Sequence, residues 1–170
     1  DEVVRTTTKL VELSTTLHSN QASHQSGGYL AFGTHNLKRL FLAEIGSVAD
    51  PAQLELFRGF AEEKARRVHQ YWLKDDSVVS SWQSRDEQQQ RYGGAVLFTN
   101  PTRRCSAEYP YVIAFSGLKE VVDESVSLIL GRSLGLGDKK LVERVKTISN
   151  NFVIPEMLEA AKPFYTPISR

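Results

Sequence analysis

The sequence predicts an α+β fold of two layers, in which an antiparallel sheet is flanked by helices. Two kinds of pattern favour this class. A long amphipathic helical pattern follows Asp50 and Pro51, and two pairs of short apolar segments have the length and composition of β-strands. A second helical pattern, from Lys119 to Leu134, follows directly on the later pair. A chain of 170 residues suits one main domain with at most a small appended segment.

The N-terminal part is expected to form a helix followed by a strand hairpin. In residues 3–18, Leu10, Leu13 and Leu17 are spaced to share one helical face. Several threonines lower the helix propensity of this segment, so packing must stabilise it. The segments that follow are predicted to be a loop and two short strands: residues 19–28, 29–32 and 39–45.

The central helix has the clearest pattern. Asp50 is a favourable N-cap, and Pro51 suits the first helical position. Residues 74–91 are polar and are expected to be partly helical around Val78, Val79 and Trp82. Apolar residues of the central helix recur at steps of three or four and should form one buried stripe: Leu54, Phe57, Ala61, Ala65, Val68 and Trp72.

The second half begins with the later pair of strands, within residues 92–98 and 109–116. The helix that follows should end near Gly135, a typical stop signal. Its expected inner stripe consists of Val122, Val126, Ile129 and Leu130.

The C-terminal segment is predicted to contain one more helix, from Lys140 to about Asn150. Beyond it Pro155, Pro163 and Pro167 should prevent a long helix, so we expect a docked or loose extension. The chain is therefore divided into a domain and a C-terminal helical extension: residues 1–135 and 136–170.

Composition excludes several classes of protein. A net charge of +1 gives no overall attraction to nucleic acid, and no apolar run approaches the roughly 20 residues that span a bilayer. Cys105 is the single cysteine, so no internal disulfide can form. The first residues lack the layout of a signal peptide. We expect a cytoplasmic protein without nucleic-acid or membrane partners.

Four motifs suggest a family. They are Tyr92-Gly93-Gly94-Ala95-Val96-Leu97, Tyr109-Pro110-Tyr111, Ser116-Gly117-Leu118-Lys119 with Asp123 shortly after, and Arg66-Arg67-Val68-His69. With these motifs the chain resembles the haem-degrading domain superfamily (GlcG/HbpS-like), in particular its uncharacterised bacterial and fungal cytosolic branch. The resemblance covers roughly residues 3–135. It implies a profilin-like fold, a symmetric homo-oligomer, and binding of haem or another small ligand.

The cofactor implied by the resemblance stays open. Where the family branch usually has a histidine before Gly-Gly, this chain has Tyr92, and where it has Asp-His after Ser-Gly-Leu, this chain has Asp123 and Glu124. Two imidazoles are thus absent, which weakens the prediction of haem. A dedicated metal site is not expected either, because His18, His24 and His35 are scattered in or beside loops.

Six residues are candidate ligand-binding groups, and each has a structural alternative. The guanidinium of Arg67 suits a carboxylate or phosphate, or it pairs with Glu63 one helical turn earlier. A histidine on the central helix can exchange protons near neutral pH, or it is satisfied by a nearby carbonyl. A serine after the second strand pair offers a hydroxyl to a ligand or an N-cap to the helix. The set is Arg67, His69, Tyr92, Gly93, Gly94 and Ser116.

Three hypotheses for function follow. The first is a homo-oligomeric protein that binds a small molecule, haem-type or an anionic organic ligand, between the central helix and the sheet. The second is an isomerase, lyase or cyclase in which His69 or Tyr92 transfers a proton. The third is a protein-interaction module that uses the proline-punctuated residues 152–170.

Overall fold

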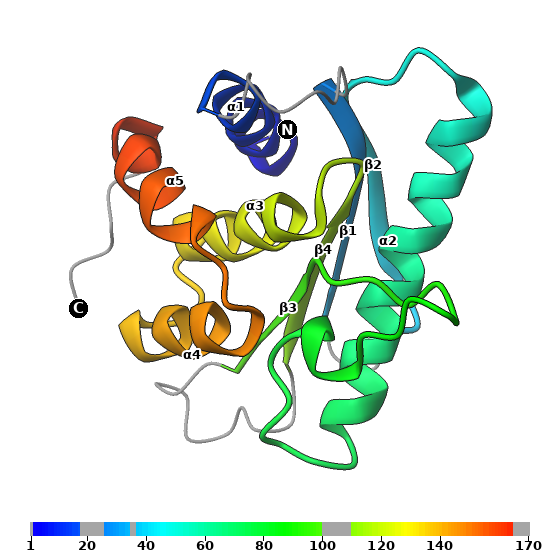
Figure 1. Ribbon diagram of the computed structural model, residues 1–170, viewed down its shortest axis with the longest axis vertical. Coiled ribbons are helices and arrows are strands. Elements are labelled where there is room, and N and C mark those ends of the chain that lie inside the picture. Colours follow the sequence, from blue (N-terminus) through cyan, green and yellow to red (C-terminus); the bar gives the residue numbers. More distant parts are fainter. Residues whose placement is uncertain (1, 18–25, 35–36, 100–109, 165–170) are drawn as a thin grey trace.

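The computed structural model describes residues 2–17, 26–34, 37–99 and 110–164 (Figure 1). Its helices and strands follow the order of the predicted patterns. The elements are α1 (Glu2–Leu17), β1 (Ser26–Thr34), β2 (Leu40–Ser47), α2 (Pro51–Trp72), the 3₁₀ helix η1 (Ser81–Ser84), β3 (Ala95–Phe98), β4 (Tyr111–Ser116), α3 (Glu120–Ser133), α4 (Lys139–Ser149), α5 (Val153–Ala161) and the 3₁₀ helix η2 (Lys162–Phe164).

The two predicted strand pairs join into one antiparallel sheet of order β2-β1-β4-β3. The central strand β1 pairs with β2 on one side, for example Leu30 with Ala43, and with β4 on the other, Leu30 with Phe115. Strand β3 pairs with β4, with Val96 opposite Ile113. The α+β class and the antiparallel sheet flanked by helices are therefore confirmed.

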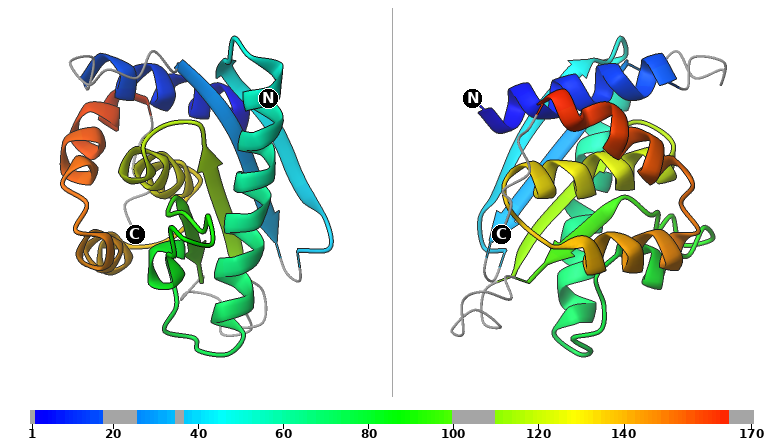
Figure 2. Two further views of the ribbon diagram at one scale, coloured as in Figure 1. Left: turned by 45° about the vertical axis from the view of Figure 1, so that its right-hand side comes forward. Right: turned by 90° about the vertical axis from the view of Figure 1, so that its left-hand side faces the viewer.

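Side chains that alternate along the strands divide the core between the two faces of the sheet. On β1, Leu30 belongs to a cluster with α1, α3, α4 and α5, whereas Ala31 belongs to a cluster with α2. Figures 1 and 2 show the same arrangement, with α2 against one face and α1, α3 and α5 against the other. Each cluster is thus one layer of helix packed on one layer of sheet.

Several element boundaries follow from local chemistry. Helix α2 begins at Pro51 as predicted, and Asp50 Oδ1 accepts a hydrogen bond from the Ala52 N–H at 2.9 Å. Strand β1 begins at Ser26, inside the predicted loop, because its early residues pair with the end of β2. Within the polar segment 74–91, the one helical element is the 3₁₀ helix around Trp82, and the expected helix does not extend to Val78 and Val79.

The C-terminal segment packs into the folded core. Helix α5 has Val153, Ile154 and Met157 buried, and it lies beside α3 and α1. Pro155 occupies the third position of this helix, where its missing N–H costs no intrahelical hydrogen bond. For that reason the proline does not prevent a helix here, and α5 shows the docked form of the expected extension, whereas Pro167 lies outside the described residues.

Candidate functional site

The chain brings several predicted site residues together where α2 meets the start of β3. The Arg67 Nη2 group donates a hydrogen bond to the Tyr92 carbonyl oxygen at 2.5 Å. The Gly93 N–H donates to Glu120 Oε2 on α3 at 2.6 Å, and the Gly94 carbonyl accepts from Ser127 Oγ at 2.8 Å. The segment that carries the two glycines is thus held by both helix layers.

The N–H groups of the Arg67 guanidinium all donate hydrogen bonds to acceptors within the protein. Its Nε and Nη2 donate to the two carboxylate oxygens of Glu63, at 2.6 and 3.2 Å. Its Nη1 donates to the Ser81 carbonyl at 2.9 Å and to Ser84 Oγ at 2.7 Å. With the bond to Tyr92, all five N–H groups have acceptors, so Arg67 stabilises the packing of η1 on α2 instead of offering donors to a ligand.

Side chains fill the space beside the two glycines. A β-carbon added to Gly93 would lie 2.3 Å from Trp82 Nε1. One added to Gly94, whose φ is +122°, would lie 2.8 Å from Asp123 Cβ and 2.9 Å from Lys64 Nζ. The glycines therefore permit close packing of protein groups, which is the structural alternative that their sequence pattern left open.

The other candidate side chains pack against different neighbours. His69 is buried on α2 with its ring 5.9 Å from that of Trp72, and two residues separate it from Arg67, or roughly 200° around the helix. The Tyr92 ring packs edge-on against Phe60 at 5.2 Å. Ser116 is buried at the end of β4, and the N-cap of α3 is Lys119, so the N-cap alternative for Ser116 was wrong.

A buried ion pair passes beside Gly94 and was missed in the sequence. Lys64 Nζ on α2 donates to Asp123 Oδ2 on α3 at 2.9 Å and to the Phe115 carbonyl at 3.0 Å. Both charged side chains are 2% exposed. Burial raises the pKa of Asp123 to about 6, against the attraction of the Lys64 ammonium and the hydrogen bond from it.

Two further carboxylates of α3 bind neighbouring segments. Glu124 is buried and accepts hydrogen bonds from Ser80 Oγ at 2.6 Å and Asn151 Nδ2 at 3.0 Å, and burial raises its pKa. Glu120 accepts two hydrogen bonds from Arg85, both at 2.9 Å. Although partial burial opposes it, the Arg85 guanidinium and the Gly93 N–H lower the pKa of Glu120. Helix α3 thus connects both helix layers through polar side chains.

A sequence signal for the ion pair does exist. Lys64 lies three residues after Ala61 and four before Val68, so it falls on the apolar stripe of the central helix. Asp123 lies three residues before Val126, on the inner stripe of its own helix. A charged residue on each of two buried stripes predicts either a mutual pair or a functional group, since an isolated buried charge is very costly.

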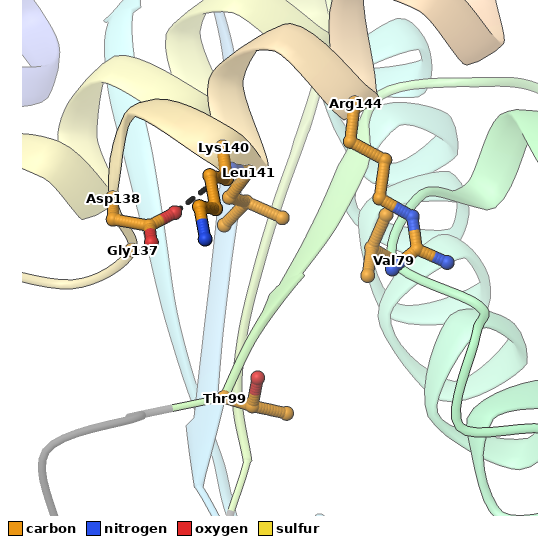
Figure 3. Close-up of a pocket in the computed structure, with 7 residues that line it drawn as sticks. All are labelled: Val79, Thr99, Gly137, Asp138, Lys140, Leu141 and Arg144. Atoms are coloured by element: carbon orange, nitrogen blue, oxygen red, sulfur yellow. Dashed lines mark hydrogen bonds between the residues drawn. The ribbon is translucent and has the colours of Figure 1, made fainter.

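A separate hollow of about 200 Å³ lies between the start of α4 and the end of β3 (Figure 3). The side chains of Lys140 and Arg144 project from α4 toward it, and Thr99 follows the end of β3 below. Its other lining residues are Val79, Gly137, Asp138 and Leu141.

The charged side chains that line this hollow are predominantly cationic. The lining carries two positive side chains, Lys140 and Arg144, and one negative, Asp138, and all three are exposed. Asp138 caps α4, with Oδ1 accepting from the Leu141 N–H at 2.9 Å. Arg144 donates to the Ser77 carbonyl, which holds its guanidinium beside Val79. Together with the positive end of the helix dipole, these groups favour an anion.

Comparison of the chain with protein-family models, with curated proteins and with solved structures finds no match. The resemblance to the haem-degrading superfamily therefore stays a prediction. No helix within the described ranges has the length and apolar character to cross a membrane. In the same part of the chain, no three His, Cys, Asp or Glu side chains are grouped so that they could hold a metal ion.

Haem does not fit the residues of this hollow. The group needs a large apolar pocket and, in most proteins, an axial side chain such as histidine. The hollow is smaller than the roughly 300–1,000 Å³ of pockets for drug-sized ligands, and no histidine lines it. His69, the one histidine among the described residues, is packed against Trp72 on α2.

Proposed function

We propose that this protein binds a small anionic molecule, of the size of a phosphate or a short carboxylate, in the hollow between α4 and β3. The observation that carries the proposal is the placement of Lys140 and Arg144 around one concave site at a helix N-terminus. A cavity of about 200 Å³ suits a ligand of few atoms. This function retains the predicted class, an anionic organic ligand, but moves the site away from Arg67.

The three cationic or polar groups have separable roles in this proposal. Arg144 is oriented by its hydrogen bond to the Ser77 carbonyl, and its planar guanidinium suits a bidentate contact with an anion. Lys140 supplies a mobile point charge, and the Thr99 hydroxyl donates or accepts one hydrogen bond. Asp138 lies on the same rim, and its negative charge lowers the affinity for any anion bound there.

Binding is better supported than acid–base catalysis. The enzyme hypothesis required His69 or Tyr92 to transfer a proton to one bound substrate. His69 is buried beside Trp72, and the Tyr92 ring packs on Phe60, so their side chains take part in packing on different parts of α2. The interaction-module hypothesis is less well supported. The apolar face of α5 is buried within the chain, so it cannot serve as a docking surface for a partner.

The test is titration of the full chain with inorganic phosphate and with malonate at low salt, followed by calorimetry and by thermal unfolding. We expect millimolar binding or tighter, and a rise in Tm with ligand concentration. Lys140→Ala and Arg144→Ala should each weaken binding about fivefold or more, because each removes one charge-assisted contact. Lys139→Ala is the matched control, since Lys139 is an exposed neighbour on α4 outside the lining.

Two outcomes contradict the proposal. One is the absence of a heat signal and of a Tm shift with both anions. The other is binding that Lys139→Ala weakens as much as Arg144→Ala, because that result would indicate general attraction to a basic surface.

A further inference from the structure

A single buried carboxylate on α3 is hydrogen-bonded to both segments that form walls of the hollow. The first wall is residues 77–80, which include the lining residue Val79 and whose Ser77 carbonyl accepts a hydrogen bond from Arg144. The second wall is α4, from which Arg144 projects beside Val79 (Figure 3). Glu124 is fully buried and accepts hydrogen bonds from both segments.

The two oxygens of Glu124 have different partners. Oε1 accepts a hydrogen bond from Ser80 Oγ at 2.6 Å, and Ser80 adjoins Val79 on the first wall. Oε2 accepts from Asn151 Nδ2 at 3.0 Å. Asn151 follows the C-cap of α4, and its backbone N–H donates to the Lys146 carbonyl within that helix at 3.0 Å. One side chain thus fixes the first wall and the C-terminal end of α4 relative to each other.

This arrangement requires the ionised form of the carboxyl group. A carboxylate accepts hydrogen bonds at both oxygens, whereas a neutral carboxyl group carries a donor on one of them. The amide nitrogen of Asn151 has only donors, so its bond is lost when a proton occupies Oε2. A proton on Oε1 displaces the hydroxyl proton of Ser80 from that oxygen instead. Protonation of Glu124 therefore weakens its hold on one of the two walls.

We propose that Glu124 is a positioning residue of the anion site, and that its ionised form keeps Arg144 and Val79 in the arrangement that binds the anion. This inference rests on the proposed function, because it assigns regulation to the same hollow. Protonation of Glu124 loosens one wall and lowers the affinity for the anion, so the site releases its ligand as the pH falls.

The surroundings of Glu124 make this protonation easier than in a solvated glutamate. Burial raises the pKa of Glu124 above its ordinary value of 4.5, and repulsion by Glu120 on the same helix acts in the same direction. Glu120 is itself paired with Arg85, which follows η1. Three neutral side chains face Glu124 from the first wall and from the end of α4, and they favour its charged form: Ser149, Ser80 and Asn151.

The first test measures sulfate binding to the full chain by calorimetry. Glu124→Gln should weaken this binding about fivefold or more near neutral pH, because glutamine, like the neutral acid, puts a donor where the carboxylate had an acceptor. Asp123→Asn is the matched control and should leave the affinity unchanged. It alters the neighbouring buried carboxyl group of α3, whose hydrogen bonds come from Lys64 and the Leu118 N–H, which belong to neither wall.

A pH profile separates positioning by the charged group from a general structural effect. Sulfate keeps its double charge as the pH falls from neutral toward 4.5, the ordinary pKa of a glutamate, whereas phosphate does not. The dissociation constant of Glu124→Gln divided by that of the parent chain should fall toward one, because the parent's carboxyl group becomes protonated. Titration of Asp138 on the rim affects both proteins and cancels in this ratio.

Ser80→Ala is a second, milder variant that removes only the link to the first wall, and it should weaken sulfate binding about twofold or more. Parental affinity in both Glu124→Gln and Ser80→Ala, a ratio that stays constant with pH, or equal weakening by Asp123→Asn would overturn this inference and leave the anion site standing. Absence of sulfate binding by the parent chain would overturn the proposed function, and this inference with it. Weakening by Glu124→Gln and Ser80→Ala, with a ratio that converges at low pH, supports the assignment.

Discussion

Gly94 has no side chain at the point where a lysine of one helix layer meets an aspartate of the other. Its φ of +122° is a conformation that side chains rarely tolerate, and its Cα hydrogens lie against the Lys64 and Asp123 side chains. The ion pair therefore passes close to the backbone at this residue, directly before β3. The neighbouring Gly93 has a different partner, the Trp82 indole, so the two adjacent glycines serve two separate contacts.

We predict that Gly94→Ala lowers the free energy of unfolding by about 2 kcal/mol or more, through backbone strain and displacement of the ion pair. Gly59→Ala is the control. Gly59 lies within α2, and a β-carbon there would meet no atom within 4 Å, so this change should stabilise the protein by about 0.5–1 kcal/mol. Urea unfolding measures both values. Equal stability of Gly94→Ala and the parent chain would contradict the packing at Gly94.

The carboxyl group of Asp123 predicts a dependence of stability on pH. Its pKa in the folded chain is about 6, raised by burial from 3.8. The folded state thus holds this proton more tightly than the unfolded chain does. The contribution of Asp123 to stability is therefore fully present below pH 3.8 and is lost as the pH rises through about 6.

The measurement compares unfolding of the parent chain with that of Asp123→Asn across this range. The parent chain should lose stability relative to the variant as the pH rises, because the variant has no carboxyl group to ionise at this position. The opposite contribution of Glu120, whose pKa is lowered, is common to both proteins and cancels in the difference. A difference that stays constant from pH 4 to 7 would show that Asp123 titrates normally.

At the scale of elements, the Lys64–Asp123 pair connects α2 and α3 across opposite faces of the sheet. A buried ion pair of this kind contributes little net stability over apolar residues of similar size, yet loss of one partner leaves a buried charge without compensation. The pair therefore specifies how the two helix layers align more than it strengthens the fold.

A double-mutant cycle tests this role. Lys64→Met and Asp123→Leu should each lower the free energy of unfolding by about 3–5 kcal/mol, whereas the double variant should cost far less than their sum. The partly exposed pair of Arg58 and Glu62 on α2 is the reference, and Arg58→Ala should cost about 0.5 kcal/mol or less. Additive effects at Lys64 and Asp123 would mean that the two side chains do not interact in solution.

Elements with strong local signals could be predicted from the sequence, and elements that depend on partners could not. Asp50, Pro51 and the apolar stripe after them predict α2 to the residue at its start. The three early residues of β1 have weak strand propensity and are ordered by pairing with β2. Helix α5 was missed because Pro155 suggested a break, although its position in the first turn is compatible with a helix.

At the scale of the whole molecule, the fold brings Arg67 and Gly93 together and places protein side chains against both. Sequence motifs predicted their meeting, since both lie on elements that the α+β topology packs together. They could not predict that Trp82, Lys64 and Glu63 would surround these residues, because such packing depends on side chains from two separate segments, α2 and η1. No motif in the sequence marks the hollow beside α4. It forms because α4 packs near the end of β3.

The most direct measurement follows the backbone amides of the ¹⁵N-labelled full chain while inorganic phosphate is added. Binding in the hollow predicts progressive, saturable shifts at Thr99, Gly137 and Leu141, with the amides of Gly93 and Gly94 unchanged. Saturable shifts at Gly93 and Gly94, with none around α4, would contradict the account in two ways. They would show that a ligand reaches the packed groups around the two glycines, and that the anion does not bind in the hollow.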